Sequence, residues 1–167
     1  DVIADWPVPA ASAAVVGTSG VLAGYGDGSR EFRLASVTKP LAARAAQVAV
    51  EEGVVDLDTP AGPPGATVRH LLAHASGLSM HSAETLAAPG SRRVYSNYGF
   101  GVLAGTIETH SGIEFGRYLS EAVFEPLGMS ASRLEGGAHA AGFGGVSTVD
   151  DLAVFAADLL RPRTVSA

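Results

Sequence analysis

The chain has 167 residues, of which 47% are hydrophobic and 17% charged, a balance typical of one globular domain rather than of a disordered segment. Its formal net charge of −6 argues against a nucleic-acid partner, which requires a basic face, and no apolar run is long enough to span a bilayer. The absence of cysteine excludes disulfides, thiolate metal sites and thiol catalysis.

The chain opens at Asp1 rather than at a methionine, so we expect an upstream segment to be missing. No basic stretch followed by an apolar stretch marks a signal peptide at this end. A cytoplasmic location is therefore slightly favoured, although the compartment is not fixed by the sequence.

The first predicted elements are strands. Residues Ala13–Val16 and Val21–Tyr25 are short β-prone runs, and the Gly17–Gly20 segment between them predicts a hairpin. Phe32–Ala35 is a third short extended segment.

From Ser36 the apolar residues recur at helical spacing, and Gly53 is expected to end this helix. Thr67 is a candidate cap for a short helix from Val68 to His74. Asn97 is expected to cap a third helix, and Pro126 to end a fourth, because proline cannot continue the hydrogen-bond ladder. The later predicted segments are a helix over 98–110 after Asn97, a helix over 114–124, a glycine-rich loop over 136–145, and a helix over 149–160 capped by Ser147 or Thr148.

This list contains about five helices but only two or three strands, all of them at the start of the chain. A lone hairpin is marginal in water and leaves its edges exposed. Either the protein is helical with an appended hairpin, or residues absent from this chain complete the sheet. We favour the second interpretation.

Ser36-Val37-Thr38-Lys39 places a hydroxyl and an amine three residues apart at the entrance of the first helix. Positions i and i+3 lie on one helix face, so a neutral Lys39 amine could take the proton of Ser36 and activate it as a nucleophile. The alternative is a capping serine followed by a surface lysine, and S-x-x-K occurs by chance about once in a chain of this length. The chain contains ten arginines and a single lysine, Lys39. A GC-rich coding sequence alone could produce this bias.

Tyr95-Ser96-Asn97 is the second candidate motif. A tyrosine hydroxyl near an ammonium group can relay a proton, and the Asn97 amide could orient Lys39 or a substrate carbonyl. Taken alone, an aromatic residue followed by an asparagine helix cap explains the same residues.

Taken together, these motifs make the sequence similar to the serine β-lactamase and penicillin-binding-protein superfamily. It most resembles the class C β-lactamases and the related esterases and D,D-peptidases. Five stretches carry the resemblance in the order and spacing of that family: Leu34–Lys39, Thr67–Leu78, Pro89-Gly90 with Tyr95–Asn97, Pro126–Met129, and Ser147–Leu152.

The resemblance implies that Ser36 is acylated, that Lys39 helps to activate it, and that Tyr95 is the general acid and base. It also implies an α/β fold of the β-lactamase/transpeptidase type, in which an antiparallel sheet packs on a helical lobe. The family's third motif, Lys-Thr-Gly or His-x-Gly on a late strand, is missing. His110-Ser111-Gly112 has suitable letters but closes the helix after Tyr95, so we reject it.

We therefore expect one incomplete domain over residues 1–167, with the first sheet strands in 1–35 and the nucleophile helix and helical lobe in 36–167. The expected partners are a small ester or amide substrate (a small ester, a β-lactam or a D-amino-acid peptide) and a C-terminal segment of the same protein that completes the sheet. We expect no cofactor and no metal: His70 and His74 have a zinc-like spacing, but Leu71 replaces the expected glutamate and no third ligand is evident. The alternatives are a catalytically inactive binding or regulatory member of the same fold, and an inert fragment.

Overall fold

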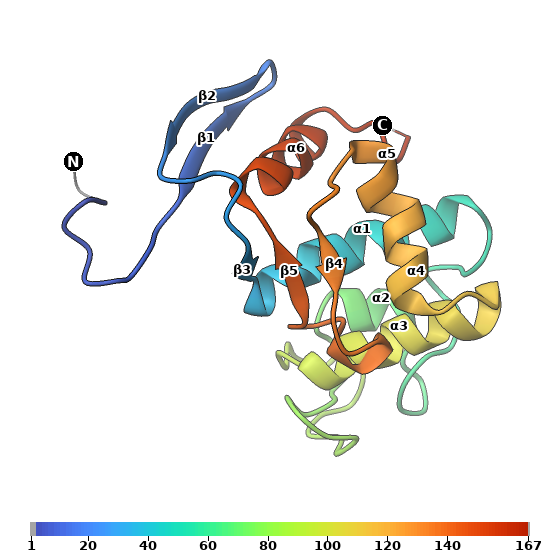
Figure 1. Ribbon diagram of the computed structural model, residues 1–167. Helices are drawn as coiled ribbons and strands as arrows, with labels where there is room; N and C mark the ends of the chain where they lie inside the picture. Colours follow the sequence, from blue (N-terminus) through green and yellow to red (C-terminus); the bar gives the residue numbers. More distant parts are fainter. Residues whose placement is uncertain (1–2, 167) are drawn as a thin grey trace.

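The computed structural model describes residues 3–166 and has an α/β architecture. Figure 1 shows helices gathered on one side, with the short strands between them and an extended N-terminal arm. The core lies among the helices and contains large side chains with almost no exposure: Leu41, Leu71, Leu103, Ile107, Phe115, Leu119, Val123 and Met129.

The predicted hairpin is confirmed. Strands β1 (Ala13–Gly17) and β2 (Gly20–Tyr25) pair antiparallel, with a register shift between Val15 and Val16. The hairpin packs beside helix α6 (Val149–Leu160) and projects from the rest of the molecule (Figure 1).

A second, three-stranded sheet corrects the expectation that all strands lie at the start of the chain. Its order is β3 (Phe32–Arg33), β5 (Gly145–Ser147) and β4 (Arg133–Leu134), and both pairings are antiparallel. Strands of two or three residues are too short to show a period in the sequence, so the late strands β4 and β5 were not predicted. They form because β5 is buried between two partners. The predicted extended segment Phe32–Ala35 is shorter in the structure, where only Phe32 and Arg33 pair with β5.

Helix α1 (Thr38–Glu51) is preceded by a 3₁₀ turn over Ala35–Val37. The predicted helix is therefore present, but Ser36 lies in this tighter turn rather than in the α-helix itself. After α1 ends, Gly53 adopts a φ of +71°, a conformation that glycine accepts at little cost.

Two predicted helix boundaries were wrong. Helix α2 is only Val68–Leu72, because His74 turns into the left-handed region with a φ of +56° instead of continuing the helix. Helix α3 is Asn97–Ser111, and its cap is Ser96 rather than Asn97: the Ser96 hydroxyl accepts a hydrogen bond from the Gly99 N–H at 2.7 Å. The extended backbone of Ser96 points its short side chain back at the first turn.

The fourth predicted helix does not stop before Pro126. Helix α4 (Phe115–Leu119) passes into a π-helical turn over Ser120–Phe124 and then into α5 (Glu125–Leu127). A π turn is wider than an α turn, so it accommodates the missing N–H and the ring of Pro126 without breaking the path of the chain.

The last helix begins where it was predicted. Thr148, one of the two candidate caps, accepts a hydrogen bond from the Asp151 N–H at 3.1 Å. A short 3₁₀ turn over Ala138–Ala140 lies within the glycine-rich loop that precedes β5. Among residues 3–166, no helix is both long and apolar enough to cross a membrane.

Candidate active site

Ser36 lies at an exposed turn whose backbone is held in an unusual conformation. The preceding residue, Ala35, has a φ of +45°, which costs an L-residue roughly 1 kcal/mol. Such strain persists only where neighbouring contacts determine the backbone.

Thr38 provides those contacts. Its fully buried hydroxyl donates to the Ala35 carbonyl oxygen at 2.7 Å and accepts from the Gly145 N–H at 2.8 Å. The Leu34 N–H donates to the Gly145 carbonyl oxygen at 2.9 Å, so both ends of the turn are joined to strand β5. The late strand, which sequence reasoning missed, thus fixes the position of Ser36.

Lys39 lies one helical turn after Ser36, and its side chain is only 6% exposed. Its Nζ atom donates to Asn97 Oδ1 at 2.6 Å, to the Gly142 carbonyl oxygen at 2.7 Å and to Ser36 Oγ at 3.3 Å. An ammonium group has three N–H bonds, so this arrangement uses all of them.

Two aromatic rings also face the Lys39 nitrogen. It lies 4.4 Å from the centroid of the Tyr95 ring and 5.7 Å from that of Phe100. Both distances fall within the range of cation–π attraction, which is stronger when the cation is shielded from water. The rings therefore attract this nitrogen when it carries a positive charge.

Tyr95 is partly exposed, with 38% of its surface accessible, so the residue borders the solvent. Hydrogen-bonding interactions with Lys39 and then with Ser36 hold the pKa of the Tyr95 phenol below its ordinary value. The phenol therefore releases its proton more readily than an isolated tyrosine does.

The structure brings together all four residues that the sequence predicted: Ser36, Lys39, Tyr95 and Asn97. Asn97 was expected to orient either Lys39 or a substrate. Its side-chain oxygen is engaged by Lys39, which leaves the NH₂ group as the part that could donate to a substrate carbonyl.

Three further residues lie at the site and were not among its predicted residues. Gly142 contributes a backbone carbonyl, for which no side-chain motif exists. For Phe100 the sequence left two roles open, flanking the site or packing in the core, with core packing preferred; it is 3% exposed, and its ring also faces Lys39. His74 was considered only as half of a metal pair, yet its ring lies 4.5 Å from the Tyr95 ring and 5.2 Å from that of Phe100.

The two histidines of that pair have separate partners. His74 Nδ1 accepts from the Ser96 N–H at 3.1 Å, whereas His70 Nδ1 lies 3.0 Å from the Thr67 hydroxyl. Within residues 3–166, no group of three or more acidic, histidine or cysteine side chains is arranged to hold a metal ion. The rejected His110-Ser111-Gly112 segment closes α3, as expected.

Comparison with protein families gives one clear match. The family model described as Beta-lactamase matches residues 4–167. Penicillin-binding protein 4* of Bacillus subtilis is 31% identical in an alignment that covers 62% of this chain and 30% of that protein.

Solved structures agree with this match. A β-lactamase from Mycobacterium bovis is 73% identical, with a TM-score of 0.98 over 99% of this chain and 61% of its own. The octameric penicillin-binding protein homologue from Pyrococcus abyssi is 22% identical, with a TM-score of 0.78 over 93% of this chain and 53% of its own, and so shares the fold. The chain spans less than two thirds of the length of each of these relatives.

Proposed function

The chain belongs to the beta-lactamase family, and on this premise we propose that it carries the nucleophile, base and acid of a serine hydrolase acting through an acyl-enzyme. The observation that carries the proposal is the contact of 3.3 Å between Lys39 Nζ and Ser36 Oγ, beside the Tyr95 phenol. A nucleophile in reach of a base, with the base oriented by further groups, is the general signature of an activated serine.

The three hydrogen bonds of Lys39 support its role as the base. A neutral amine has two N–H bonds and one lone pair. The neutral amine can use its two N–H bonds for the two short contacts, to Asn97 Oδ1 and to the Gly142 carbonyl oxygen. Its lone pair can then face the Ser36 hydroxyl. Ser36 attacks an ester or amide carbonyl while its proton passes to Lys39, and the protonated lysine keeps the same three partners.

Tyr95 is suited to the second proton transfer. Its phenol interacts with both Lys39 and Ser36, so it can pass a proton between them and the leaving group. The partial exposure of Tyr95 is consistent with a residue that a substrate can reach. Water then releases the acyl group by the same path in reverse.

The tetrahedral intermediate needs donors for its oxyanion. The Ser36 backbone N–H is one donor, and we assign the second to a strand N–H from the C-terminal segment that carries the missing third motif. Asn97 binds the substrate carbonyl through its NH₂ group. The substrate classes compatible with this chemistry are small esters, β-lactams and D-amino-acid peptides.

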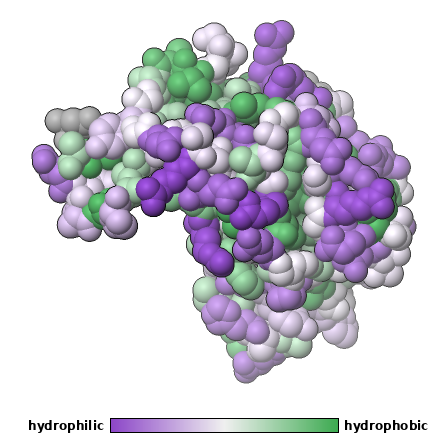
Figure 2. Space-filling model, in the orientation of Figure 1, coloured by the Kyte–Doolittle hydropathy of each residue, from purple (hydrophilic) through white to green (hydrophobic). Residues whose placement is uncertain are grey.

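A C-terminal segment of the same protein has an available surface. The N-terminal arm, β3 and the start of α6 enclose an apolar groove of about 350 Å³, lined by Trp6, Val8, Ala10, Ala11, Ser12, Phe32, Leu34, Ser147, Thr148, Val149 and Leu152. Val15, Val21 and Leu22 of the hairpin are each at least 59% exposed, and Figure 2 shows apolar surface there. The β-lactamase from Mycobacterium bovis is longer than the matched region, since this chain covers 61% of it.

This docking proposal is tested by comparing residues 1–167 alone with the same chain carrying its C-terminal continuation. We expect the continuation to slow amide hydrogen exchange in β1, β2 and β3. Equal exchange in the two samples, with full enzymatic competence of residues 1–167, would rule it out.

The catalytic proposal is tested by intact mass spectrometry of the full-length protein after incubation with a fluorophosphonate probe. We expect one adduct that maps to Ser36 and disappears in Ser36→Ala. The matched control is Ser91→Ala, which removes an exposed serine hydroxyl bonded to the Ala88 carbonyl, and it should label normally. If the wild type is not labelled, the inactive binding or regulatory member becomes the better interpretation.

A further inference from the structure

His74 stands where the chain should prefer glycine. It follows α2, and its backbone N–H donates to the Leu71 carbonyl at 3.1 Å while the Ala75 N–H donates to the His70 carbonyl at 2.7 Å. These two bonds define a Schellman motif, whose left-handed position is usually occupied by glycine. A histidine with a φ of +56° is conformationally strained there, so we expect contacts of its side chain to offset this strain.

The side chain and backbone of His74 hold three consecutive residues of the segment that carries Tyr95. The His74 carbonyl accepts the Val94 N–H at 2.7 Å, and His74 Nδ1 accepts the Ser96 N–H at 3.1 Å. Between these two bonds, the imidazole ring packs on the Tyr95 ring at 4.5 Å with an interplanar angle of 31°. His74 thus binds the residues before and after Tyr95 and packs on one face of the Tyr95 ring.

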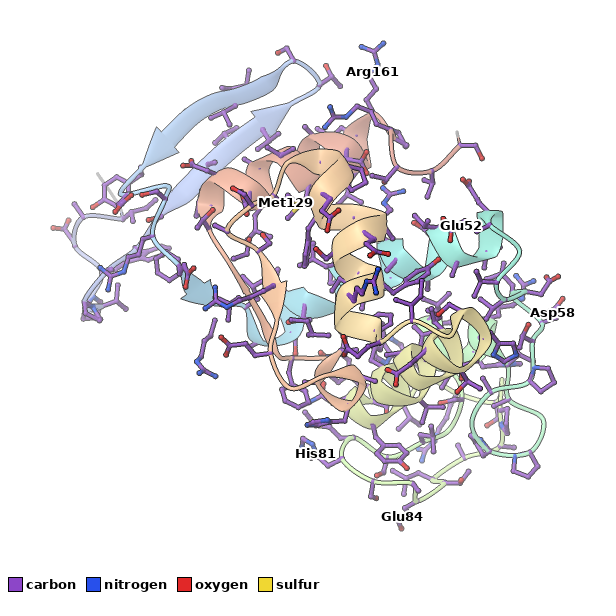
Figure 3. All side chains as sticks on the ribbon, turned by 45° about the vertical axis from the view of Figure 1, so that its right-hand side comes forward. Glu52, Asp58, His81, Glu84, Met129 and Arg161 are labelled. Atoms are coloured by element: carbon purple, nitrogen blue, oxygen red, sulfur yellow. The ribbon has the colours of Figure 1, made fainter. Side chains whose placement is uncertain are left out.

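The neighbouring contacts make this arrangement rigid. His74 is 7% exposed, and its ring also packs against Phe100. Ser96 is anchored a second time, because its hydroxyl donates to the Ser79 carbonyl oxygen at 2.6 Å. The loop that contains Ser79 also carries His81 and Glu84, and Figure 3 shows it at the lower edge of the molecule. Because Tyr95 is partly exposed, these neighbours, rather than a surrounding core, determine its position.

We propose that His74 is a positioning residue that acts through Tyr95, holding the phenol against Lys39 and Ser36 by accepting the Ser96 N–H and packing on the Tyr95 ring. The proposal rests on the function proposed above. For this bond to form, the ring must be neutral with its proton on Nε2. A displacement of about 1 Å in a proton-transfer group can lower a rate on the order of 100-fold.

The test compares two substitutions of His74 in the full-length protein. His74→Leu removes the acceptor and the ring. His74→Asn keeps an oxygen near the place of Nδ1, and asparagine tolerates a positive φ. We expect His74→Leu to slow the acylation of Ser36 by a fluorophosphonate roughly 10- to 100-fold, and His74→Asn to recover most of that loss. The matched control is His70→Leu on the preceding helix α2. The Nδ1 atom of His70 contacts Thr67 instead, so this variant should acylate at the wild-type rate.

A double-mutant cycle with Tyr95→Phe separates positioning from general structural damage. If His74 acts through the Tyr95 hydroxyl, His74→Leu should slow acylation by less than about 3-fold when Tyr95 is already phenylalanine. An equal loss in both backgrounds, or no loss in the wild-type background, overturns the positioning role. If His74→Leu does not fold, the same cycle is run with His74→Gly, which accepts the positive φ and also removes the acceptor and the ring.

The two proposals fail in different ways. Absence of Ser36 labelling in the wild type overturns the proposed function itself. Normal Ser36 labelling with no effect of His74 substitutions overturns only the positioning role.

Discussion

Lys39 Nζ lies 2.7 Å from the carbonyl oxygen of Gly142, which joins helix α1 to a loop 103 residues further along the chain. This bond requires the loop to pass very close to α3. A Cβ atom built on Gly142 would lie 3.2 Å from the Cα atom of Asn97 and 3.3 Å from its carbonyl oxygen. Glycine at position 142 therefore lets one loop reach both Lys39 and Asn97.

Gly142→Ala is expected to push this loop away from α3 and weaken the bond to Lys39. The free energy of unfolding should fall by about 1–2 kcal/mol, and Ser36 acylation should slow roughly 10-fold. The control is Gly105→Ala on α3 itself, because a Cβ there meets no atom within 4 Å. That variant should gain up to about 1 kcal/mol of stability from helix propensity. Urea unfolding and probe labelling measure both effects, and equal behaviour of the two variants would contradict the argument.

Lys39→Arg is expected to abolish most activity although it preserves the positive charge. Arginine cannot supply a neutral amine under these conditions, and its planar group cannot reproduce three bonds that converge on one nitrogen. The rate of Ser36 acylation should fall on the order of 10²- to 10⁴-fold, the contribution typical of a general base. The labelling reaction is stopped at several times, and intact mass spectrometry of each sample gives this rate. Near-normal acylation in a folded Lys39→Arg variant would show that another group takes the proton.

His74 should make the protein less stable in mild acid. Burial first, and then the charges of Lys39 on α1 and Arg93 on the loop before Tyr95, lower the pKa of His74 from 6.5 to about 4. As the pH falls from about 6.5 to about 4, this residue becomes protonated in the unfolded chain while it stays mostly neutral in the folded chain. Stability is therefore lost over this window, by at most about 3 kcal/mol, and the loss stops below the folded pKa.

His74→Asn removes the titrating group, so its unfolding free energy should depend less steeply on pH in this window. Urea unfolding at several pH values for both proteins gives the two slopes. Parallel curves would mean that His74 does not contribute to the acid sensitivity.

The buried ion pair between Arg44 and Asp158 should be the most costly one to break. Its N–O distance is 3.3 Å, and the two side chains are 5% and 0% exposed. Asp158 also accepts from the N–H groups of Arg163 and Thr164 and from the Thr164 hydroxyl, so it ties the end of the chain to α6. Asp158→Asn leaves Arg44 buried without a counter-charge and should cost about 3–5 kcal/mol.

The matched control is Asp58→Asn, whose partner Arg69 lies at the same 3.3 Å but is 57% exposed, with Asp58 at 76%. Water screens that pair, so its loss should cost less than about 1 kcal/mol. Thermal unfolding of the two variants measures the difference. A similar small shift in both would show that burial does not set the strength of the Arg44–Asp158 pair.

The local features of the fold could be predicted where the pattern was long enough to read. The β1–β2 hairpin and the helices α1, α3 and α6 each carry a turn signal or several periods of apolar residues. The strands β4 and β5 carry neither, because they extend for only two and three residues. Their conformation is set by pairing with each other and with β3.

For the candidate site, the sequence by itself determined the groups to which we assign chemistry: the hydroxyl of Ser36, the amine of Lys39, the phenol of Tyr95 and the amide of Asn97. Side-chain chemistry is readable from single letters and short spacings. Only the tertiary structure decided what surrounds them, namely the Gly142 carbonyl on Lys39, the tie from Thr38 to Gly145, and the position of His74 against Tyr95. These contacts join residues far apart in the chain, or use backbone atoms that every residue carries, so no local pattern of letters specifies them.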